Sequence, residues 1–148
     1  MELDHNFSEF IASLRVHDVR FLVVGGYAVA FHGHPRYTGD LDVWLLVDDA
    51  NARAVLAALE DFGFGDVGLT VEDFSTPGRV VQLGYPPLRI DLLTSIDGVD
   101  FAEAYDRRIE AALSRVSVPF ISLEDLRRNK AASGRWQDRA DLEALGDD

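Results

Sequence analysis

The sequence predicts an α/β (α+β) domain in which a mixed β-sheet is flanked by helices. Segments with apolar residues at helical spacing alternate along the chain with short apolar runs that are typical of strands. Of the 148 residues, 47% are hydrophobic, which is enough apolar material for one core. No repeat, low-complexity run or linker interrupts the pattern, so residues 1–148 are expected to fold as a single domain.

The first part of the chain is predicted to alternate between helix and strand. Residues 6–17 form an amphipathic helix, because apolar residues recur in them at helical spacing. The apolar run 20–24 predicts a strand that two glycines end, and a short helix over 27–32 follows, stopped by Gly33. A second apolar run predicts a strand over 41–47.

The middle of the chain predicts one more helix and a pair of strands. Asp48 or Asp49 caps the helix, which Gly63 ends. Residues 79–83 and 88–93 are typical of two antiparallel strands joined by a Gly-Tyr-Pro-Pro turn.

The last third of the chain is predicted to be mainly helical at its end. A capping-box pattern at Ser122 opens a helix that runs to about Ser133. A final helix is expected over 136–145, packing partly through Trp136. The apolar spacing within 100–120 fits a helix, but it does not exclude strands, and this segment stays open.

Two carboxylates stand one residue apart at the start of the second predicted strand. Because side chains alternate faces along a strand, Asp40 and Asp42 point the same way, roughly 7 Å apart. Like charges held that close repel unless a cation lies between them, and hard oxygen ligands suit Mg²⁺. The alternative is an ordinary turn, for which Gly-Asp is common. The spacing favours a metal-dependent phosphate site.

A third carboxylate, Asp91, lies in the later strand on the same face as Arg89. An aspartate within an apolar run is rarely unpaired, because burying a bare charge is costly. If this strand neighbours the one that carries Asp40 and Asp42, the three acids converge on one edge of the sheet. Three converging carboxylates can bridge two divalent ions about 4 Å apart, an arrangement used for phosphoryl or nucleotidyl transfer.

A glycine pair and a short loop precede these acids. The backbone N–H groups of Gly25 and Gly26 can approach an anion closely, although a glycine pair is also ordinary at a tight turn. Arg36 is suited to reach a phosphate, to balance the acids, or to form a plain salt bridge. Thr38 either contacts a ligand or orders the loop.

The motifs that carry a family resemblance are spread over roughly residues 20–142. They are Gly25-Gly26, Arg36-x-Thr38-x-Asp40-Leu41-Asp42, Arg89-Ile90-Asp91, and the segment from Ser122 through Lys130 and Gly134-Arg135 to Asp138. Together they resemble the polymerase-beta-type nucleotidyltransferase superfamily. The likeness is closer to its small bacterial members, including AbiEii-type and minimal nucleotidyltransferases of toxin–antitoxin modules.

This resemblance implies a small nucleotidyltransferase fold with a short helix and then strands in 100–120. It also implies transfer of a nucleoside monophosphate from a nucleoside triphosphate to a hydroxyl, with release of pyrophosphate. The catalytic and metal-binding residues would be Asp40, Asp42 and Asp91, with Mg²⁺ or Mn²⁺ as cofactor, and the nucleotide-binding residues would be Gly25, Gly26, Arg36, Thr38 and Lys130. Lys130 also lies near a helix end, where the helix dipole alone favours a cation.

Two further acids, Asp138 and Asp141, lie three residues apart on one helical face. A metal pair is conceivable at this spacing, but pairing with Arg135 or Arg139 on the surface is the commoner outcome. These acids are therefore left out of the expected chemistry.

The acceptor hydroxyl stays open between a tRNA 3′ end, a partner toxin or antitoxin protein, and a small alcohol. A partner protein or a second copy of the chain in a homodimer is expected to complete the site. A non-catalytic antitoxin or binding module of the same fold is the main alternative, and the three acids count against it. A phosphohydrolase ranks last, because the sequence has no P-loop and no His-Asp pair of the HD type.

Composition limits the binding partners and the cellular location that we expect for this chain. The net charge is −12, with 14 basic against 26 acidic residues, which disfavours a grip on long nucleic acid. The chain has no cysteine, so disulfides, thiolate zinc sites and thiol nucleophiles are excluded. The acidic N-terminal residues do not resemble a signal peptide, and no apolar run is long enough to span a bilayer. A cytoplasmic protein without membrane contact is expected.

Overall fold

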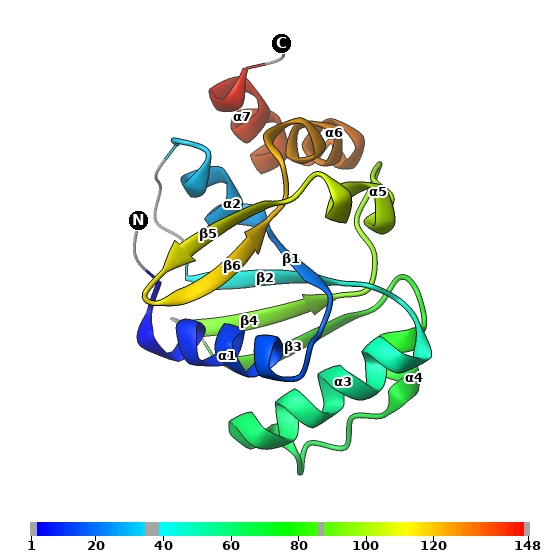
Figure 1. Cartoon of the computed structure of the whole chain (residues 1–148). Coiled ribbons are helices and arrows are strands. Elements are labelled where there is room, and N and C mark those ends of the chain that lie inside the picture. The colour runs from blue at the N-terminus through cyan, green and yellow to red at the C-terminus, as the bar shows by residue number, and fades with distance from the viewer. Residues whose placement is uncertain (1–2, 35–38, 86–87, 147–148) are drawn as a thin grey trace.

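A computed structural model of the chain describes residues 3–34, 39–85 and 88–146, and its centre is a six-stranded sheet (Figure 1). In chain order the strands are β1 (Phe21–Val24), β2 (Asp40–Leu45), β3 (Val80–Tyr85), β4 (Leu88–Leu93), β5 (Ile109–Leu113) and β6 (Val116–Phe120). They stand in the order β3-β4-β2-β1-β6-β5. The pairs β2–β4 and β1–β6 are parallel and the others antiparallel, so the predicted mixed sheet is confirmed.

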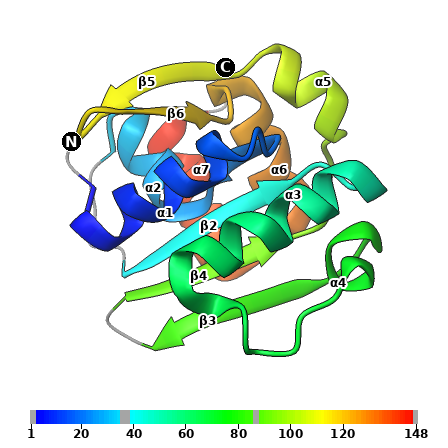
Figure 2. The same ribbon diagram turned by 60° about the horizontal axis from the view of Figure 1, so that its bottom comes forward.

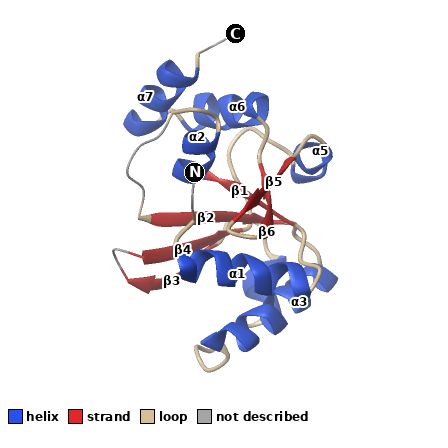
Figure 3. Ribbon diagram, turned by 60° about the vertical axis from the view of Figure 1, so that its left-hand side comes forward, coloured by secondary structure: helices blue, strands red, loops and turns tan. Residues whose placement is uncertain are grey.

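Helices cover both faces of this sheet. They are α1 (His5–Val16), α2 (Gly25–Phe31), α3 (Asp49–Leu59), α4 (Val71–Ser75), α5 (Phe101–Asp106), α6 (Leu123–Ser133) and α7 (Trp136–Leu145), and a π-helical turn, η1 (Glu60–Phe64), continues α3. Figures 1 and 3 show α1 and α3 on one side of the sheet and α2, α6 and α7 on the other. Figure 2 shows α4 beside α3. The predicted fold class is confirmed.

The first helix packs through the apolar stripe that its sequence predicts. Phe7, Phe10, Ile11 and Leu14 are each at most 1% exposed. Burying an apolar side chain of this size contributes about 1.5–3 kcal/mol. This stripe therefore holds α1 against the sheet.

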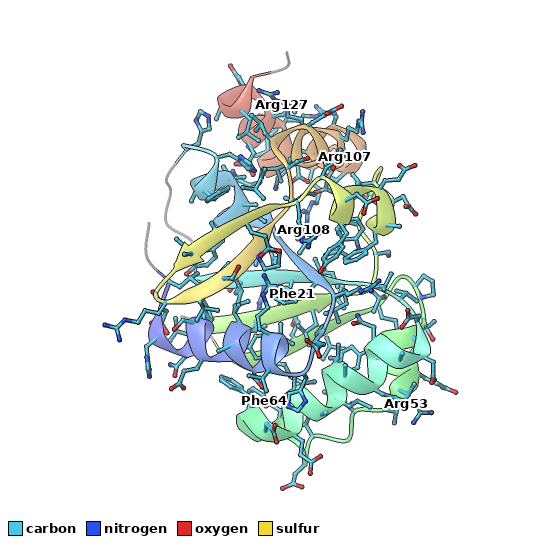
Figure 4. All side chains as sticks on the ribbon, in the orientation of Figure 1. Phe21, Arg53, Phe64, Arg107, Arg108 and Arg127 are labelled. Atoms are coloured by element: carbon cyan, nitrogen blue, oxygen red, sulfur yellow. The ribbon has the colours of Figure 1, made fainter. Side chains whose placement is uncertain are left out.

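Helix α6 is fixed at both ends. The Oγ of Ser122 accepts a hydrogen bond from the backbone N–H of Asp125 (3.1 Å), and Gly134 ends the helix in the left-handed region at φ 62°. Arg107, labelled in Figure 4, donates two hydrogen bonds to the fully buried carboxylate of Asp125 (2.9 and 3.0 Å). The segment after α5 is thereby tied to the first turn of α6.

Segment 100–120 forms a short helix and then two strands, as the resemblance implied. The helical interpretation of its apolar spacing is wrong beyond α5. Strands β5 and β6 form a hairpin whose two-residue turn is Ser114-Arg115. Both turn residues have positive φ, 50° and 67°, as a type I′ hairpin turn requires. Local apolar spacing could not reveal a turn that lacks glycine and asparagine.

Several other boundaries differ from the sequence predictions. Helix α2 begins at Gly25 itself, α3 passes into a π-helical turn in which Gly63 has φ 107°, and α4 was not predicted. Trp136 was expected to pack but is 87% exposed, so that prediction is wrong. The buried residues of α7 include Asp138, Asp141 and Leu145, and Trp136 lies away from that face.

Candidate active site

The sheet brings the two acid-bearing strands together. Strands β2 and β4 are parallel neighbours, and their register places Asp42 opposite Asp91 and Asp40 opposite Arg89. The convergence of acids expected from the sequence depended on this strand pairing, and the pairing is present. Asp91 is buried at 8% exposure, whereas the side chain of Asp40 is 41% exposed.

Arg89 lies between two of the three acids. Its Nη2 donates to Asp40 Oδ2 (2.9 Å) and to Asp91 Oδ2 (3.2 Å), and its Nε donates to Asp91 Oδ1 (3.0 Å). The hydrogen bond to Asp91 is the main cause that raises the pKa of the guanidinium. Arg89 was expected only to stand beside Asp91, and the alternation of side chains along β4 was the signal that could have identified it as their counter-ion.

The glycine turn lies directly against Asp42. Strand β1 pairs antiparallel with β2, with Val24 opposite Asp42, so Gly25 follows at the same edge. Gly25 has φ +69°, and a Cβ added there would overlap Oδ2 of Asp42. Both its backbone conformation and its close approach therefore require glycine.

Asp42 is the most perturbed acid of the site. Burial first, and then the nearby charges of Asp91 and Asp40, raise the pKa of its carboxyl from 3.8 to about 7. Lys130 acts in the opposite direction but more weakly. The folded protein therefore resists the negative charge on Asp42, and a nearby cation would favour the charged form of this carboxyl.

A buried ionic network on α6 and α7 lies across from Asp42 and the glycine turn. Lys130 is 4% exposed, and its Nζ lies 2.9 Å from Asp138 Oδ1 and 3.1 Å from Asp141 Oδ2. Arg135 Nε donates to Asp138 Oδ2 (2.7 Å), and the Ser133 hydroxyl bonds the same oxygen. Although burial alone would raise it, bonds from Arg135, Ser133 and Lys130 lower the pKa of Asp138 to about 2.

These contacts correct the expectation for the two acids of α7. Asp138 and Asp141 are 1% and 4% exposed, so their placement on the surface was wrong. The pairing of Asp138 with Arg135 was right. The sequence spacing showed the shared face but not that α6 covers it.

One pocket of about 490 Å³ connects the glycines, Asp42 and the network. Its lining residues are Val24, Gly25, Gly26, Asp42, Val80, Leu93, Ser95, Ile96, Asp97, Asn129, Lys130, Ser133, Arg135, Gln137 and Asp138. The structure thus places three of the five predicted nucleotide-binding residues in one pocket. The other two, Arg36 and Thr38, lie outside the described residues.

The carboxylates fit a divalent cation by their chemistry, although they do not form a ready three-ligand cage. Within residues 3–34, 39–85 and 88–146, no three acidic or histidine side chains are grouped so that they could hold a metal ion. Arg89 bonds both Asp40 and Asp91 and so already supplies these two acids with a cation. Asp42 and Asp91 remain adjacent hard-oxygen donors, which suit such a cation.

No helix among the described residues is both long and apolar enough to cross a membrane.

The sheet order, the acids on neighbouring strands and the adjoining glycine turn together define a nucleotidyltransferase-type α/β domain. The chain belongs to a family of nucleotidyltransferases of unknown function (DUF6036), which matches residues 1–146. The superfamily assignment implied by the sequence motifs is confirmed, and the protein is a nucleotidyltransferase by family. No protein of curated function matches the sequence.

Three solved structures illustrate the shared fold. A candidate nucleotidyltransferase from Thermotoga maritima has a TM-score of 0.61 and 16% identity, covering 93% of this chain and 88% of its own. An antigenic nucleotidyltransferase-like protein from Paracoccidioides brasiliensis has a TM-score of 0.56 and 18% identity, covering 93% and 72%. The lincomycin-bound lincosamide antibiotic adenylyltransferase LnuA has a TM-score of 0.56 and 14% identity, covering 97% and 96%. At these identities the likeness concerns the fold.

Proposed function

We propose that this protein uses Mg²⁺ or Mn²⁺ to transfer a nucleoside monophosphate from a nucleoside triphosphate to a hydroxyl acceptor, with release of pyrophosphate. The observation that carries the proposal is the juxtaposition of Asp42 and Asp91 on paired strands, with Gly25 against Asp42. Lys130 lines the same pocket. Carboxylates beside a pocket of about 490 Å³ suit metal-assisted phosphoryl chemistry on a nucleotide.

The proposal assigns a role to each of the chain's own groups. Asp40, Asp42 and Asp91 would hold the metal, which when bound neutralises phosphate charge and acidifies the attacking hydroxyl. Asp91, buried beside Asp42, would accept the proton of that hydroxyl. Arg135 and Lys130 would offer N–H donors from the pocket wall. Because the glycine turn carries no side chain, it leaves the approach to Asp42 open.

The acceptor and the setting are part of the proposal and rest on the resemblance. A tRNA end, a partner toxin or antitoxin, and a small alcohol are its three candidate acceptors. The small-molecule candidate is supported by the fold shared with an adenylyltransferase of a lincosamide antibiotic. A toxin–antitoxin role in the cytoplasm, in an AbiEii-like subgroup, and completion of the site by a partner or a second copy belong to the same proposal.

A second candidate is a non-catalytic binding module that keeps the fold. One observation favours it, namely that Arg89 bonds both Asp40 and Asp91, as a structural ion pair would. The raised pKa of Asp42 argues for catalysis instead, because perturbed carboxyls cluster at functional sites.

The test uses each of the four α-labelled nucleoside triphosphates with Mg²⁺ or Mn²⁺, offered with tRNA, cell-extract protein or a set of small alcohols. We expect label on one acceptor class and pyrophosphate in solution, both lost in Asp42→Asn and retained in Asp66→Asn, an exposed control. Undiminished transfer by Asp42→Asn would contradict the proposal. Triphosphate binding without transfer to any acceptor supports the binding module, and release of inorganic phosphate supports a phosphohydrolase.

A further inference from the structure

Arg89 supplies the acid cluster with a cation of its own. Its guanidinium makes three hydrogen bonds of 2.9–3.2 Å to the carboxylates of Asp40 and Asp91. A guanidinium stays protonated at any ordinary pH, so this positive charge is permanent. The oxygens that it occupies belong to two of the three acids expected to bind a metal.

The sheet, rather than a flexible loop, places this arginine. Arg89 lies opposite Asp40 in the β2–β4 register, and it precedes Asp91 by two residues on the same strand face. Its side chain is 29% exposed and that of Asp91 is 11% exposed. Charge-assisted hydrogen bonds in such a half-buried position are stronger than those between fully exposed groups.

We infer that Arg89 competes with a divalent cation for Asp40 and Asp91, so that the nucleotide-free protein binds metal weakly. The inference rests on the metal site of the proposed function and adds a residue that limits metal affinity. A cation that binds these oxygens must replace the arginine's hydrogen bonds. Replacing Arg89 with a neutral side chain removes that competition and also restores the mutual repulsion of the acids, and both effects favour metal binding.

The experiment titrates the nucleotide-free protein with Mn²⁺ and follows free Mn²⁺ by electron paramagnetic resonance. We expect Arg89→Gln to bind Mn²⁺ at least about tenfold more tightly than the wild type, which corresponds to about 1.4 kcal/mol. Arg89→Lys keeps the charge but loses the planar fork that bonds two carboxylates, so its affinity should fall between the two. The matched control is Arg53→Gln, which removes one charge from α3 (Figure 4). Arg53 pairs with Asp49 rather than with the acid cluster. Its Mn²⁺ affinity should equal that of the wild type.

Circular dichroism checks that each variant is folded, and Arg89→Lys decides the question if Arg89→Gln does not fold. Equal or weaker Mn²⁺ binding by both Arg89 variants would overturn the inference. If the wild type nevertheless transfers nucleotide in the assay above, the unchanged Mn²⁺ binding overturns this inference and leaves the proposed function intact. If no variant binds Mn²⁺, the inference fails, and the transfer assay with and without Mg²⁺ or Mn²⁺ then decides the metal dependence of the proposed function separately.

Discussion

Replacing Asp42 with asparagine should stabilise the metal-free protein at alkaline pH. Burial, Asp91 and Asp40, in that order, raise the pKa of the Asp42 carboxyl to about 7 in the folded protein. The folded state therefore holds this proton more tightly than the unfolded chain does. Stability falls as pH rises from about 4 to about 7, and it stays reduced above that range, because the folded protein then carries the unfavourable charge. Asparagine has nearly the same shape and never acquires that charge.

The magnitude follows from the size of the pKa change. Each pKa unit corresponds to about 1.4 kcal/mol, so a carboxyl moved from 3.8 to about 7 can cost at most about 4 kcal/mol at high pH. Asp42 keeps partial access to solvent, which screens its neighbours and reduces the cost. We expect the wild type to lose about 2 kcal/mol more than Asp42→Asn between pH 5 and pH 8.5.

Urea denaturation at these two pH values, in the presence of a chelator, measures the difference. Asp66→Asn, which removes an exposed carboxylate, should follow the wild type. At pH 8.5, excess Mg²⁺ in place of the chelator should raise the free energy of unfolding of the wild type and leave that of Asp42→Asn nearly unchanged. Parallel pH profiles for the wild type and Asp42→Asn would refute the reasoning, because they would mean that the folded protein does not resist the charge on Asp42.

Two further substitutions test the walls of the same pocket. Gly25→Ala should cost about 3 kcal/mol in unfolding free energy and abolish nucleotide transfer, because the new Cβ overlaps Asp42 at a positive φ. Gly33→Ala has the same sign of φ but open space, so it should cost only about 1 kcal/mol, and equal costs would dismiss the overlap. Lys130→Met leaves two buried carboxylates without their shared cation and should cost about 3 kcal/mol by urea denaturation. Adding Asp141→Asn should recover about 1 kcal/mol of that loss, and a double variant less stable than Lys130→Met would argue against the shared ion pair.

The placement of the acids could be predicted from the sequence because it depends on a local rule. Alternation along a strand puts Asp40 and Asp42 on one face, and it puts Arg89 and Asp91 on one face of another strand. That these two strands are neighbours is a tertiary fact, and the sequence could state it only as a condition. The family resemblance made the condition reasonable, and the β2–β4 register meets it.

The ionic network of α6 and α7 lay beyond sequence reasoning for a related reason. Charged residues three apart on a helix are usually solvated, and only the packing of α7 on α6 makes Asp138 and Asp141 buried. Because α7 turns this face toward α6, Trp136 is exposed to solvent although it is hydrophobic. Whether a helical face is inside or outside depends on the partner helix, and apolar content predicts this poorly when the buried face is itself charged.

The charges in the described part of the pocket bear on the proposed metal dependence. A nucleoside triphosphate is strongly anionic, and the cationic side chains that line the described pocket are Lys130 and Arg135. Both already bond Asp138, and Arg89, the nearby cation of the acid cluster, bonds Asp40 and Asp91. The positive charge of these groups is therefore largely offset before any substrate arrives, and Asp42 adds a carboxyl that itself favours a cation. Among the described residues, a triphosphate beside Asp42 would therefore be favoured by a divalent counter-charge of its own, in line with the proposed metal dependence.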